Sequence, residues 1–372
     1  MKDVREIKLH ASRKSTILIE YGLKEDAGHI IMKNIGGAKA VLVCDETVGK
    51  LYGDDMSASL AAGGYSVSVF RFPAGEQSKN LQTYSDLLSF AAENELSRSD
   101  VFIALGGGVT GDLGGFAAAT YMRGINLVQI PTSLLAMVDS SVGGKTAVDL
   151  PQGKNLAGAF YQPDLVICDP SFLKTLPSRI YQDGFAEIIK YGILSGRDLF
   201  DRIKTPEAVA REDIKDIITD CIELKAEITE VDEKDRDTRQ MLNLGHTAGH
   251  AAEVLSGYNY SHGRSVAAGL LVIAAASNSA GICSEDCVCD VREAIEAWEL
   301  CDVTLPSAGE ISQAAFSDKK RRGDKITAVL IKDIGDCFLK SMSFADFSAL
   351  IEAGMQNPEI RIKNICGNSC GA

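Results

Sequence analysis

Four short runs rich in β-branched and aromatic residues alternate with helix-like stretches in the first half of the chain. The runs lie at residues 40–46, 65–72, 100–108 and 125–131, and residues 80–96 carry apolar side chains at helical spacing. Strands that alternate with helices predict a parallel sheet, because a parallel connection must return to the same end of the sheet and usually does so as a helix. The first half is therefore predicted to be an α/β domain.

The strand pattern fades beyond about residue 177, and helical patterns take its place. Helical spacing is found at residues 181–196, 211–235, 265–281 and 289–300. A chain of 372 residues is long enough for two hydrophobic cores. We therefore predict an α/β domain over residues 1–174 and a mainly α-helical domain over residues 175–372.

The formal net charge of −13 restricts the partners of the protein. A nucleic acid or an anionic membrane surface would be repelled unless a local basic site compensated. The N-terminus lacks the apolar run of a signal peptide, and no stretch of about 18 residues is both apolar and free of charge, which predicts a cytoplasmic protein. An anionic small-molecule substrate would need a dedicated cluster of lysines and arginines.

The ten cysteines are expected to be free thiols in a reducing compartment. Cys283, Cys287 and Cys289 form one group, and Cys366 and Cys370 form another. Either group could bind a metal, but neither has the C-x-x-C spacing of a structural zinc site. Helix packing for the first group and a loose C-terminal tail for the second are the alternatives.

A glycine-rich loop follows the strand predicted at residues 100–108. Gly106, Gly108 and Gly111 satisfy the pattern G-x-G-x-x-G just before a helix of small residues. Such a loop can hold a pyrophosphate on backbone N–H groups at a helix N-terminus. No acidic residue lies at the usual distance downstream, so Asp45 and Glu46 are the candidates for the ribose hydroxyls. A tight turn without a ligand is the alternative.

The segment "GGKT" at residues 143–146 is like the end of a P-loop, but Asp139 occupies the position of its first glycine. This segment therefore does not support ATP or GTP binding. Lys145, Lys154 and Asn155 remain suited to hold an anionic ligand near the glycine loop. Solvated surface charges are the alternative interpretation.

His246 and His250 lie four residues apart in a predicted helix, so both imidazoles face the same side. Thr247 follows His246, which excludes the H-E-x-x-H pattern of a zinc protease. His262 and Glu187 could complete a metal site, because an unpaired carboxylate among the apolar neighbours of Glu187 would be costly. A His/His/Glu set with an open position suits catalytic zinc. Satisfied core histidines are the alternative.

Several longer stretches together resemble the 3-dehydroquinate synthase family, the second enzyme of the shikimate pathway. They are "PAGEQSK", "GGGVTGDLGGFAAATYMRG", "QIPTSLLAMVDSSVGGKTAVDLPQGKNLAGAFYQP", "GFAEIIKYG", "LNLGHTAGHAAE", "HG" at 262–263 and "SDKKRRG". The resemblance implies a Rossmann-like NAD-binding domain, a mainly α-helical metal-binding domain, an active site between them and a homodimer. It also implies a role in chorismate and aromatic amino acid biosynthesis.

The resemblance assigns site residues. It implies that Glu187, His246 and His262 bind zinc or cobalt, with His250 in the active site rather than as a ligand. For NAD, the family pattern falls on Asp45, Glu76, Lys79, Gly106, Gly107, Gly108, Val109, Asp112, Thr132 and Ser133. For the substrate, it falls on Arg123, Asp139, Lys145, Lys154, Asn155, Lys190, Lys225, Arg239, Asn243 and one or both of Lys319 and Lys320.

The implied reaction is redox-neutral. In this family 3-deoxy-arabino-heptulosonate 7-phosphate is transiently oxidised with NAD, loses phosphate, is reduced again and closes by an intramolecular aldol step. The cationic residues match a phosphate and a carboxylate. Lys145 and Lys190 are expected to steady developing negative charge, with His250 and Asn243 near the transferred protons.

The chain departs from the family pattern at Arg264, where relatives commonly have Glu, and Ser133 replaces a frequent Thr.

Three other functions stay open at this point. They are a sister cyclase that makes an inosose or a valiolone, a metal-dependent polyol or glycerol dehydrogenase, and a non-catalytic NAD-sensing or scaffold protein.

Overall fold

The computed structural model describes residues 4–257, 259–319 and 325–358. The chain forms two compact units, Met1–Pro177 with Ile218–Lys234, and Ser178–Ile217 with Asp235–Ala372. The first segment of unit one ends at Pro177, three residues after the predicted boundary at residue 174. Residues 218–234, which we assigned to the second domain, belong to the first unit.

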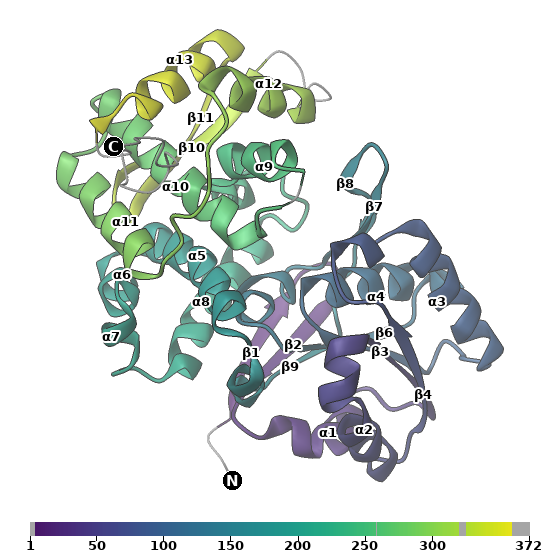
Figure 1. Ribbon diagram of the computed structural model, residues 1–372. Helices are drawn as coiled ribbons and strands as arrows, with labels where there is room; N and C mark the ends of the chain where they lie inside the picture. The colour runs from purple at the N-terminus through teal and green to yellow at the C-terminus, as the bar shows by residue number, and fades with distance from the viewer. Residues whose placement is uncertain (1–3, 258, 320–324, 359–372) are drawn as a thin grey trace, which may run out of the picture. The chain divides into compact units, whose positions relative to one another are not determined.

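The first unit is built on a seven-stranded sheet with the order β1-β2-β9-β6-β5-β3-β4 (Figure 1). β1 and β2 pair antiparallel, and every other neighbouring pair in the sheet is parallel. The parallel α/β prediction is thus confirmed. The strands are β1 (Arg5–His10), β2 (Lys14–Ile19), β3 (Lys39–Asp45), β4 (Ser66–Phe72), β5 (Val101–Gly106), β6 (Asn126–Pro131) and β9 (Leu165–Cys168).

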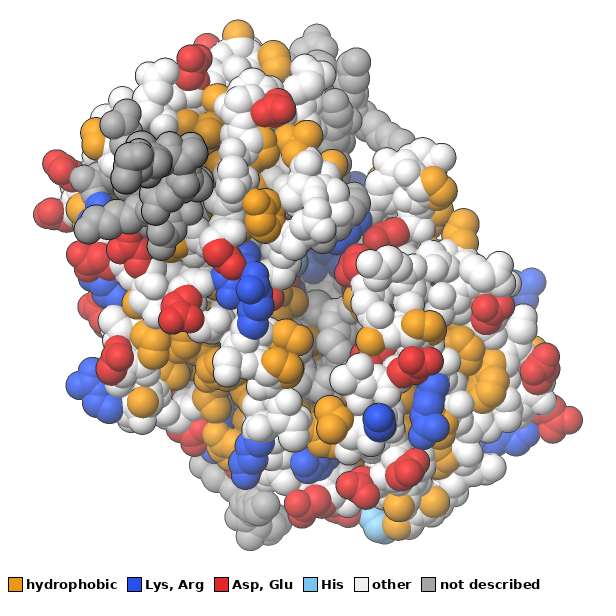
Figure 2. All heavy atoms as spheres, viewed as in Figure 1, with side chains coloured by type: hydrophobic (Ala, Val, Ile, Leu, Met, Phe, Trp, Pro, Cys, Tyr) orange, Lys and Arg blue, Asp and Glu red, His pale blue; other side chains and the backbone are white. Residues whose placement is uncertain are grey.

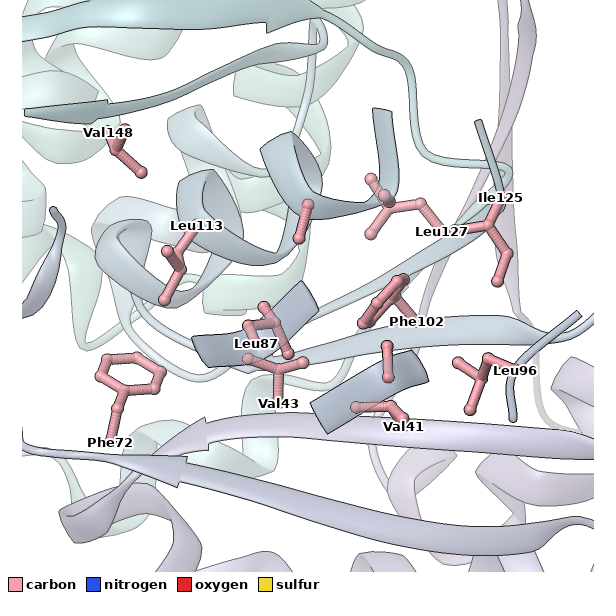
Figure 3. Packing of buried hydrophobic residues seen from close by; sticks show 13 residues of the cluster. Val41, Val43, Phe72, Leu87, Leu96, Phe102, Leu113, Ile125, Leu127 and Val148 are labelled. Carbon is pink, nitrogen blue, oxygen red and sulfur yellow. The ribbon is translucent and has the colours of Figure 1, made fainter. Parts of the chain in front are cut away.

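Helices pack against both faces of this sheet. Successive side chains of a strand point to opposite faces, and the apolar residues of β3 and β5 must be buried on both of them. Val41 and Val43 of β3 pack with Leu87 and Leu113 in one hydrophobic core (Figure 3). Cys44 points the other way, toward α2, where a Cβ on Gly49 would lie 2.9 Å from its sulfur. The helical segments of this unit are η1 (Leu23–Asp26), α1 (Ala27–Asn34), α2 (Glu46–Ala62), η2 (Glu76–Ser78), α3 (Leu81–Glu93), α4 (Gly108–Thr120), η3 (Tyr121–Arg123), η4 (Ala136–Ser140) and η5 (Pro170–Thr175).

A separate hairpin, β7 (Lys145–Leu150) and β8 (Gly153–Phe160), pairs antiparallel outside the main sheet. α8 (Ile214–Val231) contributes its residues from Ile218 onward to the first unit. Neither the β7–β8 hairpin nor β1, β2 and β9 was predicted from the sequence.

Asp100 ties the starts of β3 and β5 together. Its buried carboxylate accepts hydrogen bonds from the N–H groups of Ala38 (3.1 Å), Lys39 (2.8 Å) and Ser97 (2.7 Å) and from the Ser97 hydroxyl (2.7 Å). Desolvation alone would raise the pKa of Asp100, but these hydrogen bonds outweigh it and lower the pKa.

We expect Asp100→Asn to lower the free energy of unfolding by about 2 kcal/mol at pH 7, because an amide replaces a charged acceptor of several hydrogen bonds. The pKa of Asp100 is lower in the folded than in the unfolded state, so its stabilisation is present above the unfolded pKa and is lost as the pH falls through the folded pKa. Urea unfolding should therefore show a smaller difference between the two proteins near pH 3. An equal difference at both pH values would contradict this account.

The second unit is mainly helical, as predicted, and also contains an antiparallel hairpin that was not predicted, β10 (Lys325–Asp333) with β11 (Asp336–Ser343). α10 is its most buried helix: every residue from Gly263 to Ser277 is buried, and α5, α9, α11 and α13 all pack against it. The remaining helices are α5 (Ser178–Ser195), α6 (Arg197–Ile203), α7 (Pro206–Val209), η6 (Thr238–Asn243), α9 (His246–Leu255), α10 (His262–Ser279), α11 (Glu285–Ala297), α12 (Ala308–Lys319) and α13 (Phe344–Met355).

Two surface properties bear on the partners of the protein. Within the described residues, no helix has both the length and the apolar character needed to cross a membrane. Figure 2 shows acidic and basic side chains interspersed over the face in view, and the described residues form no continuous basic strip there.

Candidate active site

The order of the strands points to a ligand site at the carboxyl ends of β3 and β5. From β3 the chain passes outward to β4 on one side, and β5 and β6 then follow on the other side, so the winding reverses between β3 and β5. Open α/β sheets bind ligands outside such a reversal point. Asp45 is the last residue of β3 and Gly106 the last of β5, so two predicted NAD contacts end the strands that flank it.

The glycine loop joins β5 directly to α4, as the nucleotide-binding pattern requires. Gly107 is the residue before α4, and no side chain caps the helix start. Gly107 lies close to the predicted residue Ser133, whose hydroxyl would be 3.4 Å from an added Cβ. The N–H of Thr132 donates a 3.0 Å hydrogen bond to the Gly106 carbonyl. The N–H groups of Gly108, Val109 and the rest of the first turn are thus available to an anion.

Packing also requires some of these glycines. An added Cβ on Gly111 would lie 2.6 Å from the side-chain oxygen of Gln129 on β6, so Gly111 lets α4 lie against the sheet. Asp45 likewise has a structural task, because its carboxylate accepts hydrogen bonds from the N–H groups of Thr47 and Val48 and caps α2. Gly111 and Asp45 thus have structural roles that do not depend on a ligand, and these roles are compatible with nucleotide binding at the same loop.

Lys79 gathers three other predicted residues around one ammonium group. Its Nζ lies 2.5 Å from Asp112 Oδ2 and 3.7 Å from Glu76 Oε1, and it donates a 2.6 Å hydrogen bond to Asn155 Oδ1. Lys154 Nζ lies 3.5 Å from the same Glu76 oxygen. The structure thus joins residues predicted for NAD with residues predicted for the substrate.

The electrostatics of this cluster follow from its burial. Desolvation would lower the pKa of Lys79, but the carboxylates of Asp112 and Glu76 outweigh it and raise the pKa. The pKa of Asp112 is also raised, because its desolvation outweighs the attraction of Lys79. Lys79 therefore stays charged and is the cation that makes the partly buried Asp112 carboxylate tolerable.

The other predicted residues of the first unit lie on separate elements. Lys225 of α8 is buried and donates from Nζ to the carbonyl (2.6 Å) and the carboxylate (2.8 Å) of Asp139 in η4. Lys145 is exposed at the start of β7. Arg123 is exposed after α4, with a left-handed φ of 66°. Among the described residues, no hydrogen bond or ion pair joins Arg123 to the Lys79 cluster.

Glu187, His246 and His262 converge in the second unit from three different helices. Glu187 is on α5 and fully buried, while His246 and His262 begin α9 and α10. Glu187 Oε1 lies 3.1 Å from His262 Nε2 and 3.4 Å from His246 Nε2. These side chains form a group whose ligand atoms all lie within 4.8 Å of one another. Lys190 contacts the other oxygen of Glu187.

The imidazole orientations favour Nε2 as the ligand atom. His246 Nδ1 is 3.1 Å from the carbonyl of Leu244, which can only accept, so Nδ1 carries the proton and Nε2 holds the lone pair. His262 Nδ1 lies 3.7 Å from Glu253 Oε2, which turns Nε2 toward Glu187. Desolvation opposes a charge on His262, but Glu187 and Glu253 outweigh it and raise the pKa of His262 to about 10. In the protein without metal, His262 is therefore protonated, and its positive charge balances the Glu187 carboxylate in place of a metal cation.

Glu253 is a residue of this site that sequence reasoning missed. It is buried in α9 and forms a second group of convergent ligand atoms with His250 and His262. The available signal was an acidic residue three positions after His250 and seven after His246, on the same face of the helix. His250 itself is exposed, and its ring centroid lies 5.3 Å from that of His246 and 5.9 Å from that of His262.

The remaining predicted residues of the second unit are placed less completely. Arg239 and Asn243 both belong to η6, which ends three residues before His246. The side chain of Arg239 is 1% exposed. Lys190 is also 1% exposed. Lys319 is the last residue of α12, its side chain lies outside the described part, and Lys320 lies outside the described residues altogether.

Comparison with known proteins identifies the family. Residues 69–183 match the model of the 3-dehydroquinate synthase N-terminal domain, and residues 184–321 match that of the C-terminal domain. The chain belongs to the 3-dehydroquinate synthase family. A 3-dehydroquinate synthase of Clostridium acetobutylicum is 45% identical over 331 residues, covering 88% of this chain and 93% of that protein. That of Clostridium botulinum is 40% identical over 349 residues, covering 92% of this chain and 100% of that protein.

Solved structures share the fold at lower identity. A 2-deoxy-scyllo-inosose synthase complexed with carbaglucose-6-phosphate, NAD+ and Co2+ has a TM-score of 0.84 at 24% identity, covering 94% of this chain and 99% of that one. A 2-epi-5-epi-valiolone synthase from Streptomyces hygroscopicus with NAD+ and Zn2+ bound has a TM-score of 0.80 at 22% identity, covering 95% of this chain and 99% of that one. A probable glycerol dehydrogenase from Sinorhizobium meliloti has a TM-score of 0.56 at 15% identity, covering 90% of this chain and 94% of that one.

Proposed function

We propose that this protein is a 3-dehydroquinate synthase, a carbon–oxygen lyase that converts 3-deoxy-arabino-heptulosonate 7-phosphate to 3-dehydroquinate and phosphate. We propose further that it uses NAD and zinc or cobalt. The observation that carries the proposal is the convergence of Glu187, His246 and His262 in a chain that is 45% identical to a 3-dehydroquinate synthase over 331 residues. The predicted cytoplasmic location and homodimer stay predictions.

The donor set fits a zinc-type ion. Ligands about 2.0–2.2 Å from a common tetrahedral ion lie about 3.3–3.6 Å apart. Glu187 Oε1 lies 3.4 Å from His246 Nε2, within this spacing, and 3.1 Å from His262 Nε2, just below it. Three protein ligands also leave a fourth position for a substrate oxygen. Glu187, His246 and His262 would therefore hold the ion.

The reversal point of the sheet and the uncapped start of α4 fit NAD, whose pyrophosphate the Gly106–Val109 segment would hold. When bound, NAD and the divalent ion supply the transient oxidation of a substrate hydroxyl and the polarisation of its oxygen. All other contributions come from side chains of this protein. In the second unit, Arg239 and Lys190 supply cationic groups for the phosphate and carboxylate of the substrate.

Proton handling falls to His250 in this proposal. Its ring lies 5.3 Å from that of His246 and 5.9 Å from that of His262, centroid to centroid, so it stands beside the ligand group without belonging to the Glu187 set. Lys190 is held by Glu187 and carries a fixed positive charge beside the metal ligands. In the first unit, Asp139 holds Lys225 Nζ by two hydrogen bonds, which fixes another ammonium group in place.

Two other enzyme classes share this fold, so an assay must separate them. We expect inorganic phosphate release from 3-deoxy-arabino-heptulosonate 7-phosphate with catalytic NAD+ and added Zn2+, with no accumulation of NADH, and loss of turnover with a chelator. Turnover only with glucose 6-phosphate or sedoheptulose 7-phosphate would indicate a sister cyclase. Steady NADH formation from a polyol would indicate a dehydrogenase. Failure to release phosphate with metal bound would favour a non-catalytic protein.

We expect Glu253→Gln to weaken Zn2+ binding about 10-fold, because the carboxylate that orients His262 and raises its basicity is lost. Competition between the apo-protein and a chromophoric chelator measures this affinity directly. Glu352→Gln on the exposed side of α13 is the control, and it should bind Zn2+ as the unaltered protein does. An unchanged affinity for the Glu253 variant would show that Glu253 does not support the ligand.

A further inference from the structure

Arg264, two residues after His262, is a buried arginine that joins three segments of the second unit. It is 3% exposed and lies in the first turn of α10. Its Nη1 donates to the Glu299 carbonyl (2.6 Å) and to the Asp302 carboxylate, both after α11. Its Nε lies 3.4 Å from Asp183 Oδ1 on α5. No part of the proposed reaction uses Arg264.

Asp183 receives contacts from both sides of His262. Ser261 precedes α10 and does not cap it; its hydroxyl donates a 2.8 Å hydrogen bond to Asp183 Oδ1 instead. Arg264 Nε lies 3.4 Å from the same oxygen and forms an ion pair with it, without a hydrogen bond. Between them, Gly263 lies so close to α5 that an added Cβ would be 2.2 Å from the Asp183 carbonyl oxygen. The start of α10 is therefore pinned to α5 at residues 261, 263 and 264.

His262 remains free of this anchor and points to Glu187. Asp183 and Glu187 are four residues apart on α5, so they lie on the same face of the helix. The anchor at Asp183 thus fixes the position of the helix turn from which His262 reaches Glu187 Oε1 at 3.1 Å. Ligand geometry in metal sites depends on such supporting contacts.

We propose that Arg264 is a positioning residue of the metal site: it holds the first turn of α10 against α5 through Asp183 and thereby keeps His262 at Glu187. Asp302 and the Glu299 carbonyl hold the guanidinium from the other side, so that one planar group serves all three segments. The inference rests on the proposed function only in assuming that Glu187, His246 and His262 bind a divalent ion.

The test measures metal binding rather than activity. The apo-protein and the variant Arg264→Met are titrated with Co2+, and the affinity and the visible absorption of the bound ion are recorded. Arg179→Met is the matched control, because Arg179 is also on α5 and donates to the same Asp302 at 2.8 Å, yet its side chain is 69% exposed and touches Asp302 rather than the start of α10. Thermal unfolding of each apo-protein accompanies the titration.

We expect Arg264→Met to weaken Co2+ binding about 10-fold and to change the absorption spectrum of the ion, while Arg179→Met leaves both unchanged. If Arg264→Met only lowers thermal stability and keeps the affinity and spectrum, Arg264 is merely structural and the proposal is wrong. If that variant does not fold, Asp183→Asn must show the weakened binding, and normal binding there overturns the proposal. If the unaltered protein does not bind Co2+, the proposed metal dependence fails as well.

Discussion

Replacing Glu187 by glutamine is expected to abolish tight metal binding and to lower phosphate release by about 10³-fold. Glu187 is fully buried, and Oε1 faces the Nε2 atoms of both His246 and His262. Glutamine keeps the shape but loses the negative charge that a divalent ion and the neighbouring Lys190 both require. A bound ion contributes several kcal/mol to stabilisation of the transition state, and each 1.36 kcal/mol corresponds to a factor of ten in rate.

Two histidine variants serve as controls for this prediction and decide between the two ligand sets that the sequence left open. His246→Ala should lose Zn2+ like the Glu187 variant, whereas His250→Ala should keep Zn2+ but lose activity. The metal content after dialysis and the rate of phosphate release are measured for each variant. Loss of Zn2+ from His250→Ala would mean that both histidines of the H-x-x-x-H pair are ligands. Full metal content in the Glu187 variant would refute the proposed metal site.

Local sequence patterns predicted the central strands and the long helices because those elements carry their own signal. The runs at residues 40–46 and 125–131 became β3 and β6, since a strand buried on both faces is apolar along its length. β10 also carries a β-branched run, "KITAVLIKD", but it lies among helical patterns and was not recognised. β1 alternates polar and apolar residues at the edge of the sheet, and β2 beside it begins with three polar residues, so both carry a weaker strand pattern.

Local sequence patterns could not predict contacts between segments that are distant in the chain. Spacing placed His246 and His250 on one face of a helix, which is correct for α9, but it could not show that α5 and α10 bring Glu187 and His262 to His246. The support of His262 by Glu253 and Arg264 also depends on how three helices pack. The return of residues 218–234 to the first unit is a further contact of this kind, because helical periodicity does not specify which core a helix joins.

Lys79→Met is expected to weaken NAD+ binding about 100-fold and to lower the free energy of unfolding by about 3 kcal/mol. Lys79 is 4% exposed, and its ammonium links Asp112 of α4 with Glu76 of η2 and Asn155 of β8. Without it, the partly buried Asp112 carboxylate lacks a cation beside the glycine loop. NAD+ affinity is measured by calorimetry and stability by urea unfolding.

The pH dependence of this variant tests the cause. Desolvation already raises the pKa of Asp112, and removing Lys79 removes the group that opposes this shift. A carboxyl whose pKa is higher in the folded than in the unfolded state destabilises the fold increasingly as the pH rises between the two values. The loss of stability should therefore be greater at pH 8 than at pH 5, and the double variant Lys79→Met with Asp112→Asn should recover much of it. A loss independent of pH, with no recovery, would mean that the alkyl chain of Lys79 matters rather than its charge.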